Sequence, residues 1–282
     1  MITCNLMGGL GNQIFQIFAT ISYAIKSRKQ FKFLNQTILG GGATTIRYTF
    51  WETFFLKLKP FLIENLPQPI HIIRENGFPY NELSIHEIRN RDVMIFGYFQ
   101  SYKYFQENYS IIYKMLNIDK MKTELLLELE FSRKFLDNSI SLHFRLGDYK
   151  KIQHVHPLAT YEYYETALTY IKLNNNDKKF NILYFCENDD IDDVMKTINR
   201  LINKFPDYNF ERGVSTLEDW QQMLLMSCCQ HNIIANSSFS WWSAYLNSNN
   251  DKIVCYPSVW FGPSVSNDTR DLCPPGWTKI KV

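Results

Sequence analysis

The amino-acid sequence predicts an α/β protein whose second half forms a doubly wound, mostly parallel sheet. From Ser139 onward, short apolar segments typical of strands alternate with segments that have the apolar spacing of helices. The segment Ile182–Cys186 is almost continuously apolar, as expected for a strand covered on both faces of a parallel sheet. Near the N-terminus, a strand-like segment, a glycine-rich loop and an amphipathic helix follow one another. That order is the outline of a ligand-binding α/β turn.

The first half is less regular than the second. Its expected strands cover residues 2–6, 32–34, 70–75 and 93–99. Ile14–Ile25 has the apolar spacing of a helix, and the aromatic residues within 43–66 also favour a helix packed into a core. Ser101 is expected to cap a helix that begins at Tyr102. A charged amphipathic helix over 120–135 is expected to connect the two halves.

In the second half, the polar residues that follow the strands are the candidate ligand-binding residues. The expected strands cover residues 139–144, 182–186, 231–235 and 253–256, and helices are expected from about 160, 190, 215 and 239. Ser215 and Glu218 have the spacing of a capping box. Ligands of doubly wound sheets bind beyond the carboxyl ends of the strands. Three polar segments lie at such ends: His143–Asp148, Glu187–Asp190 and Asn236–Ser240.

The segment His143–Asp148 carries the strongest chemical signal. His143 and Arg145 are two residues apart on a strand and therefore point the same way, and Gly147 then allows the chain to turn before Asp148. A plain salt bridge between Arg145 and Asp148 is the structural alternative. An arginine can hold a pyrophosphate through two parallel N–H bonds, which lysine cannot do. A fixed guanidinium would stabilise the charge of a departing nucleoside diphosphate without a metal ion.

The other two segments suit complementary tasks. In Asn236–Ser240, serine hydroxyls lie beside the first amides of a helix, where a phosphate binds well; an ordinary N-cap is the alternative. Asp190 and Asp192 match the DxD pattern of metal-dependent glycosyltransferases, although helix capping explains four aspartates there equally well. A carboxylate at this strand end could instead accept both N–H donors of a guanine edge.

Composition excludes several classes of protein. The chain has 282 residues, of which 45% are apolar, so a length of about two domains is expected. A formal charge of +2 gives no reason to expect nucleic acid as a partner. Six scattered cysteines lack zinc-ligand spacing and indicate a reducing compartment. The start has no signal-peptide pattern, and the longest apolar segment, of about 12 residues, falls short of the roughly 20 that span a bilayer. We expect a soluble cytoplasmic protein without stable membrane insertion.

Four motifs together resemble the α-1,2-fucosyltransferase family, glycosyltransferase family 11. They are Gly8-Gly9-Leu10-Gly11-Asn12-Gln13, Gly97-Tyr98-Phe99-Gln100-Ser101, His143-Phe144-Arg145-Leu146-Gly147-Asp148 and Asn236-Ser237-Ser238-Phe239-Ser240-Trp241-Trp242. The resemblance implies a GT-B arrangement, in which two Rossmann-like domains face a cleft. Residues 1–136 would form the acceptor-side domain and 137–282 the GDP-sugar-binding domain, with room for the extreme C-terminus to pack back on the first. Lacking the membrane anchor of animal members, the chain resembles the soluble microbial or viral forms.

The resemblance further implies GDP-fucose as donor, inversion at the anomeric carbon, no metal or other cofactor, and a glycan acceptor, usually with a terminal β-galactose. It suggests His143 near guanine or ribose, Arg145 on the β-phosphate, and Asp189 or Asp190 on guanine. The phosphates would be held by Asn236, Ser237, Ser238 and Phe239. The cleft would be faced from the other domain by Gly9, Gly11, Asn12 and Gln13.

The residues offer two candidates for the general base and more than one function. Asp148 is the first candidate base because it lies close to Arg145, although an arginine-paired carboxylate has a lowered pKa and is a poorer base. Glu75 is the second candidate. A transferase that uses another GDP-sugar is one alternative function, and a non-catalytic glycan- or nucleotide-binding protein is another. The acceptor surface is expected from residues 40–90 and from the 150–158 loop, whose His154 and His156 are equally plausible as ordinary loop residues.

Overall fold

The computed structural model describes residues 1–40, 46–85, 88 and 90–281, and it divides into two compact units. The first unit comprises residues 1–120 and 267–274, and the second comprises residues 121–266 and 275–282. The sequence analysis placed the boundary after residue 136, so residues 121–136 belong to the second unit instead. Both units combine helices with a parallel sheet, which confirms the predicted α/β class.

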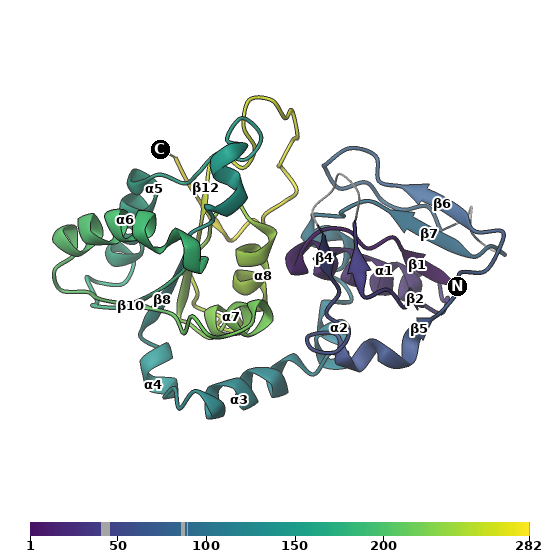
Figure 1. Cartoon of the computed structure of the whole chain (residues 1–282), viewed down its shortest axis with the longest axis horizontal. Helices are drawn as coiled ribbons and strands as arrows, with labels where there is room; N and C mark the ends of the chain where they lie inside the picture. Colours follow the sequence, from purple (N-terminus) through teal and green to yellow (C-terminus); the bar gives the residue numbers. More distant parts are fainter. Residues whose placement is uncertain (41–45, 86–87, 89, 282) are drawn as a thin grey trace. The chain divides into compact units, whose positions relative to one another are not determined.

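The first unit is built on a three-stranded parallel sheet with the order β1-β7-β6. Its elements, in chain order, are β1 (Ile2–Cys4), α1 (Leu10–Lys26), β2 (Phe33–Leu34), β3 (Ile38–Leu39), β4 (Arg47–Tyr48), η1 (Leu56–Phe61), β5 (Leu62–Ile63), β6 (His71–Arg74), β7 (Val93–Phe96), η3 (Tyr102–Tyr104) and α2 (Tyr109–Met115). The long helix α1 packs against β1 and is almost entirely buried (Figure 1). The loop that joins β1 to α1 is the predicted glycine loop.

One expected helix of this unit is wrong. Within 46–66 the chain forms turns and a short 3-10 helix, η1, which contains Pro60. Proline lacks the amide N–H that an α-helix needs in its interior, so the helical spacing of the aromatic residues did not lead to a helix. Trp51, Phe54 and Phe55 nevertheless pack into the core, as expected. Residues 41–45, 86–87 and 89 of the expected acceptor surface lie outside the described residues.

The predicted connecting helix is also two helices rather than one. Helix α3 covers Ile118–Glu128 and α4 covers Arg133–Leu136. Between them, Glu130 has a left-handed backbone with φ of 55°, which an α-helix cannot include. The Ser132 hydroxyl then caps α4 by accepting a hydrogen bond from the Phe135 amide.

The second unit contains a six-stranded parallel sheet with the order β10-β9-β8-β11-β12-β13. Its strands are β8 (Ser139–His143), β9 (Asn181–Phe185), β10 (Asn209–Arg212), β11 (His231–Ile233), β12 (Val254–Pro257) and β13 (Thr278–Ile280). Its longer helices are α5 (Tyr161–Leu173), α6 (Ile191–Lys204), α7 (Asp219–Met226) and α8 (Ser238–Leu246). Counted along the chain, the strand order is that of a Rossmann fold, and it reverses direction between β8 and β11. The two edge strands β10 and β13 were not predicted.

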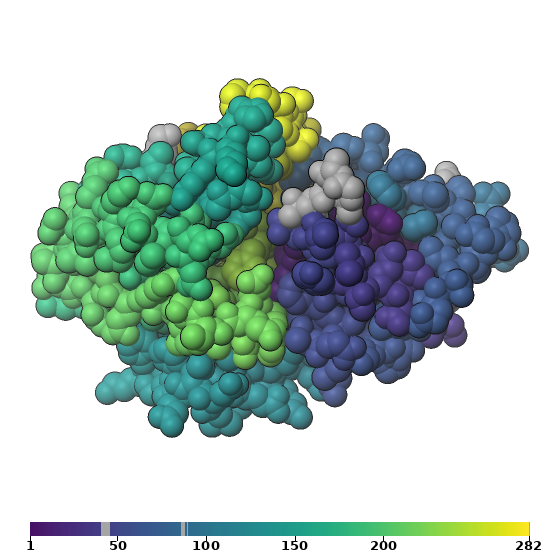
Figure 2. Space-filling model, in the orientation of Figure 1, coloured from purple at the N-terminus to yellow at the C-terminus, as the bar shows by residue number. Residues whose placement is uncertain are grey.

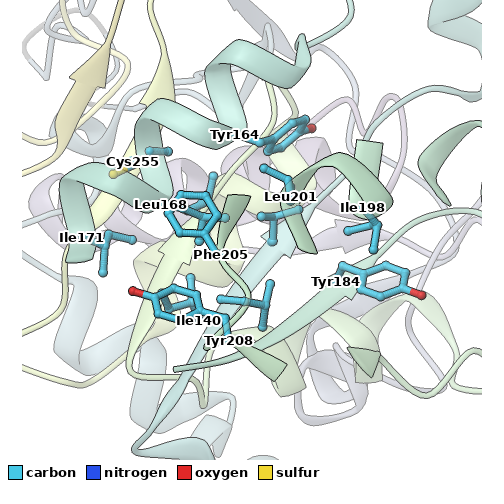
Figure 3. Packing of buried hydrophobic residues seen from close by; sticks show 14 of the residues in the cluster. Ile140, Tyr164, Leu168, Ile171, Tyr184, Ile198, Leu201, Phe205, Tyr208 and Cys255 are labelled. Carbon is cyan, nitrogen blue, oxygen red and sulfur yellow. The ribbon is translucent and has the colours of Figure 1, made fainter. Parts of the chain in front are cut away.

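Helices cover both faces of this sheet. On one face, residues of β8 and β9 such as Ile140 and Tyr184 pack against α5 and α6 (Figure 3). On the other face a buried polar network joins β8, β11 and α7, because the Asn232 side-chain amide donates to Ser141 Oγ at 2.7 Å and to the Met226 carbonyl oxygen at 2.9 Å. In the space-filling view, green atoms of the region around α6 and α7 make up much of the visible face of this unit (Figure 2). The hydrogen bond between Asn232 on β11 and Ser141 on β8 fixes the register of these two central strands.

The helix starts follow local capping rules, with one correction. Thr160 caps α5 through its hydroxyl, close to the expected start. The capping box of α7 consists of Glu218 and Gln221 rather than the predicted Ser215 and Glu218. Glu218 is itself the N-cap residue, so the helix begins three positions later than the sequence pattern suggested.

Candidate active site

The candidate site of the second unit lies where the strand order reverses. Strands β8 and β11 are neighbours in parallel register, with Ile140 opposite His231 and Leu142 opposite Ile233. Their carboxyl ends therefore lie side by side, and the segments that follow them are His143–Asp148 and Asn236–Ser240. In doubly wound sheets this reversal opens a crevice in which ligands bind. Two of the three predicted segments thus meet at the place that the fold provides for a ligand.

His143 lies at the end of β8 and is only 7% exposed. Its ring centroid is 5.5 Å from that of Phe239 at the start of α8, so it touches both segments. Burial, reinforced by the positive charge of Arg145, lowers the pKa of His143 to about 3. The imidazole is therefore neutral at physiological pH. Its Nδ1 atom has no hydrogen-bond partner among the described residues, so it can bond to a ligand.

Arg145 is the charged centre of the site. Its Nη2 pairs with Asp148 and its Nη1 pairs with Glu187, which follows β9. The first pair is the salt bridge that the sequence offered as the structural alternative. Glu187 belonged to a predicted segment but had no role there. Burial disfavours the charged guanidinium, yet Glu187 and Asp148 outweigh burial and the pKa of Arg145 is raised. The two carboxylates hold the guanidinium at the mouth of the strand.

The turn after Arg145 depends on a glycine and on a buried carboxylate. Gly147 has φ of +39°, and a Cβ atom there would lie 2.8 Å from Glu187 Oε2. Its amide donates to Asp190 Oδ2 at 2.7 Å, while Asp190 Oδ1 pairs with Lys150 at 2.7 Å. Asp190 is 3% exposed and both its oxygens are engaged, so it anchors the loop. The adjacent Asp189 is exposed, and it stays the prediction for a guanine contact.

One aspartate of the DxD pattern, Asp190, has an ion-pair partner in the structure, Lys150. Lys150 also pairs with Asp193 at 2.7 Å, so the aspartates at the start of α6 form ion pairs with the loop after β8. Within residues 1–40, 46–85, 88 and 90–281, no group of three or more His, Cys, Asp or Glu side chains that could hold a metal ion is found.

The segment after β11 positions and caps the start of α8. Asn236 is buried, and its side-chain amide donates to the carbonyl oxygens of Pro157 at 2.9 Å and Trp260 at 3.1 Å. Its Oδ1 atom has no partner in the part of the chain that the structure describes. Ser237 is the N-cap of α8 and accepts a hydrogen bond from the Phe239 amide at 3.3 Å. Ser238 and Phe239 form the first turn, where backbone amides favour an anion.

The first unit has a second polar cluster, at the carboxyl ends of β1, β6 and β7. Gly8 takes a left-handed backbone with φ of 75°, and Gly9 is the N-cap of α1, followed by Leu10 and the buried Gly11. The buried Gln13 donates from Nε2 to the carbonyl oxygens of Gly8 at 3.0 Å and Tyr48 at 2.9 Å. Asn12 Oδ1 accepts a hydrogen bond from Gln100 at 2.8 Å. The first and second motifs of the sequence therefore meet.

Glu75 and Gln16 complete this cluster. Glu75 accepts a hydrogen bond from the Tyr98 amide at 2.7 Å, and it packs so closely on Gly97 that a Cβ there would lie 2.3 Å from Glu75 Cβ. Burial raises the pKa of Glu75, although its hydrogen bonds from the backbone of Phe99 and Tyr98 lower it. Gln16, hidden in an apolar helix pattern, was missed by the sequence analysis. It accepts from the Met7 amide at 2.9 Å and donates to the Gly97 carbonyl oxygen at 3.2 Å.

Several unsatisfied polar atoms lie near these two sheet edges, and others, on Thr3 and Asn138 among them, lie elsewhere. Buried side-chain atoms without a hydrogen-bond partner among the described residues include His143 Nδ1, His156 Nδ1, Asn236 Oδ1 and Gln13 Oε1. Buried polar groups are nearly always paired, so exceptions usually mark places where water or a ligand binds. The structure thus brings the predicted donor-binding residues together in the second unit and the glycine-loop residues together in the first.

Comparisons with known proteins agree with this chemistry. The sequence model of a family described as Glycosyl transferase family 11 matches residues 70–281. The chain is 30% identical to an alpha-1,2-colitosyltransferase of Escherichia coli over 305 residues, covering 100% of this chain and 99% of that protein. It is 33% identical over 196 residues to the O-antigen biosynthesis glycosyltransferase WbnK of Escherichia coli, covering 66% of this chain and 60% of that protein.

Solved structures show a weaker likeness. The structure of a mutant of FUT1 from Arabidopsis thaliana in complex with GDP aligns with a TM-score of 0.48 and 9% identity, covering 90% of this chain and 69% of that one. The alpha-1,6-fucosyltransferase NodZ soaked with GDP-fucose aligns with a TM-score of 0.45 and 12% identity, covering 87% of this chain and 92% of that one. In the described part of the chain, no helix has both the length and the apolar character needed to cross a membrane.

Proposed function

The chain belongs to glycosyltransferase family 11, and from this premise we propose that it transfers L-fucose from GDP-fucose to the 2-hydroxyl of a terminal galactoside. The proposed reaction inverts the anomeric carbon and needs no metal ion. The observation that carries the proposal is the position of Arg145 and the start of α8 at the carboxyl ends of adjacent strands, β8 and β11. A guanidinium and a helix N-terminus are two groups that bind a diphosphate well.

Each donor-binding residue has a task in this proposal. Arg145 and the first turn of α8, which includes Ser238 and Phe239, hold the diphosphate, while the Phe239 amide itself donates to Ser237. The neutral imidazole of His143 bonds to the nucleoside through its unpartnered nitrogen. Asp189, exposed after β9, accepts the N–H donors of guanine. Asn236 and Ser237 orient the first turn of α8 through their own hydrogen bonds.

The transfer step follows from these roles. The acceptor hydroxyl oxygen attacks the anomeric carbon of fucose from the side opposite to GDP, and the bond between that carbon and the β-phosphate oxygen breaks. The electron pair leaves with GDP, whose charge grows as the bond breaks. Arg145 and the α8 amides neutralise this charge, which is the electrostatic contribution that a metal ion makes in other transferases. The hydroxyl proton passes to a general base.

We propose Glu75 as that base and keep Asp148 as the alternative. Asp148 is paired with Arg145, so one of its oxygens is already engaged by the guanidinium. Burial raises the pKa of Glu75, which makes it a better proton acceptor. Each carboxylate can be tested separately by Asp148→Asn and Glu75→Gln, with measurement of turnover and of GDP affinity.

The direct test of the function is a transfer assay. The protein is incubated with GDP-fucose, a terminal β-galactoside and excess EDTA, and the linkage of the product is determined by NMR. We expect an α-1,2-linked fucoside under these conditions. Product that forms only after a divalent metal ion is restored would refute metal independence. Absence of transfer to every galactoside, with and without metal, would refute the fucosyltransferase assignment.

A second donor is favoured by one observation. The relative that aligns along the whole chain is named an alpha-1,2-colitosyltransferase, and colitose is an analogue of fucose. Transfer of colitose from its GDP derivative is therefore the alternative function. Competition between GDP-fucose, GDP-colitose and GDP-mannose for transfer to one galactoside decides between these donors, because the true donor has the highest kcat/KM.

A further inference from the structure

We propose that Tyr149 and His156 are positioning residues: their stacked rings hold the guanidinium of Arg145 in place and connect it to the start of α8. This inference rests on the proposed function in one respect, that Arg145 binds the diphosphate of GDP. Neither residue belongs to the segments from which donor contacts were predicted.

The three side chains form a stack. The Cζ atom of Arg145 lies 4.9 Å from the ring centroid of Tyr149. The Tyr149 ring in turn stacks on His156, with centroids 4.5 Å apart and planes inclined by 13°. Phe261 closes the far side of His156, at a centroid distance of 5.6 Å. A guanidinium over an aromatic face is attracted by the negative charge of the ring face.

Backbone hydrogen bonds hold the segment that carries His156 in place. The amide of Gly262 donates to the Val155 carbonyl oxygen at 2.8 Å, and the amide of Ser264 donates to the His154 carbonyl oxygen at 3.0 Å. A Cβ atom on Gly262 would lie 2.4 Å from that same His154 oxygen, so only glycine permits this approach. The loop after β12 is thereby clamped against the residues beside His156.

The stack also joins the two diphosphate-binding elements. The Tyr149 hydroxyl donates to the Asn236 carbonyl oxygen at 3.4 Å, immediately before the N-cap of α8. The side chain of Asn236 is anchored to Pro157 and Trp260, which follow His156 and precede Phe261. The same group of residues therefore sets the position of the guanidinium and of the first turn of α8.

Arg145 needs the contact with the Tyr149 ring because its ion pairs with Asp148 and Glu187 cannot all persist when GDP binds. Asp148 and Glu187 hold the N–H edge of Arg145, and their side chains are 52% and 54% exposed. The oxygens of a diphosphate require that same N–H edge, so binding of GDP displaces at least part of these exposed, weak ion pairs. The guanidinium carbon also lies over the Tyr149 ring, an attraction that does not depend on a carboxylate. It can hold Arg145 both before and after GDP binds.

The test compares binding of GDP with binding of guanosine, which lacks the phosphates, by titration calorimetry. Tyr149→Leu removes the ring, and we expect the Kd of GDP to rise about tenfold, within the range of a partly buried cation–π contact, while the Kd of guanosine does not change. Tyr149→Phe keeps the ring and should bind GDP within about threefold of the wild type. His156→Leu should raise the Kd of GDP less than Tyr149→Leu does.

A double-mutant cycle shows whether Tyr149 acts through Arg145. In an Arg145→Met background, which removes the positive charge, Tyr149→Leu should change the Kd of GDP by less than twofold, because the positioned group is already gone. Additive effects, or an equal loss of guanosine binding, would overturn the inference. If Tyr149→Leu does not fold by circular dichroism, the same two ligands tested on His156→Leu decide: unchanged GDP binding overturns the proposal.

The two proposals can fail separately in this experiment. A wild-type protein that does not bind GDP would refute the proposed donor. A wild-type protein that binds GDP more tightly than guanosine, with Tyr149→Leu unaffected, would leave the donor proposal intact and refute the positioning role.

Discussion

The two polar clusters of this protein lie at equivalent places, the carboxyl edges of parallel sheets, yet they differ in chemistry. In the second unit the edge is charged: Arg145 and Lys150 pair with carboxylates on the loop and on the elements after β9. In the first unit the edge is mostly neutral. The side-chain amides of Gln13 and Gln16 donate to backbone carbonyl oxygens, and that of Gln100 donates to the side chain of Asn12. Glu75 adds a carboxylate there, and Asp271 pairs with Lys103 beside Ser101.

This difference suggests a division of tasks. A diphosphate carries negative charge and needs a cation that stays charged, whereas a sugar offers neutral hydroxyls, for which amides that both donate and accept are suitable partners. The charged edge therefore fits the donor and the amide edge fits a glycan acceptor. The predictions below test this comparison, beginning with the largest expected effect.

Arg145→Lys should lower kcat/KM by about 10³-fold, because a lysine cannot form two parallel hydrogen bonds to the leaving group. Steady-state kinetics with GDP-fucose measure the effect, and circular dichroism checks the fold. Arg133→Lys is the matched control, since Arg133 forms an exposed ion pair with Asp137 on α4 and should retain full activity. Near-normal turnover of Arg145→Lys would contradict the charged-edge assignment.

Glu75→Gln should lower kcat by about 10²-fold, the lower range for loss of a general base. The affinity for GDP should stay unchanged, because Glu75 belongs to the amide edge of the first unit. The glutamine can still accept the hydrogen bond from Tyr98, so the loop is preserved. Asp148→Asn serves as the comparison: if it abolishes turnover while Glu75→Gln does not, the base lies at the charged edge instead.

Gly147→Ala should destabilise the protein by about 1–2 kcal/mol, the usual cost of forcing a residue with a Cβ into the left-handed region. The new methyl group would also press on Glu187 Oε2, at 2.8 Å, and should weaken GDP binding. Gly276→Ala is the control, because its Cβ would meet nothing within 4 Å. Urea denaturation of both variants gives the difference in unfolding free energy; equal stabilities would show that the turn tolerates a side chain.

Stability should fall as the pH decreases below about 6.5, where an unfolded histidine gains a proton. Burial, with Arg145 adding to it, keeps the pKa of His143 at about 3, and burial, with Lys178 adding to it, keeps that of His231 at about 4. The unfolded chain therefore binds more protons between these values and pH 6.5, so acid favours unfolding. His143→Asn and His231→Asn should each flatten this dependence in thermal melts between pH 4 and 7.

The same pair of variants separates site from scaffold. His231 lies at the start of β11, at the opposite end of the strand from Asn236, and His231→Asn should not alter GDP affinity. His143→Asn should reduce it. An equal effect of both variants on GDP affinity would mean that His143 contributes only to stability.

The local parts of the site could be predicted from the sequence, and the partners could not. The alternation of His143 and Arg145 with apolar residues identified the end of β8, and the serines after β11 identified the start of α8. Glu187 lies 42 positions from Arg145 along the chain, and Asp190 lies 43 positions from Gly147. These pairs form because β8 and β9 are neighbours in the sheet, and no local sequence pattern predicts that pairing.

Where sequence expectations failed, a local pattern had been overridden. Pro60 and the left-handed Glu130 interrupt segments with good helical spacing, and α7 uses a capping box at Glu218 and Gln221 in place of the one expected at Ser215. Strands β10 and β13 escaped prediction because they lie at the edges of the sheet and are short and only partly buried. Edge strands lack the continuous apolar pattern of central ones.

The sequence by itself determined the α/β class, the strand that presents His143 and Arg145, and the family, because periodicity and motifs are properties of neighbouring residues. Only the tertiary structure decided which distant residues reach Arg145 and its loop: Glu187, which joins the local partner Asp148, and Asp190, which is buried and accepts from the Gly147 amide. Those contacts arise from the strand order β9-β8-β11, which brings loops from three parts of the chain to one edge of the sheet.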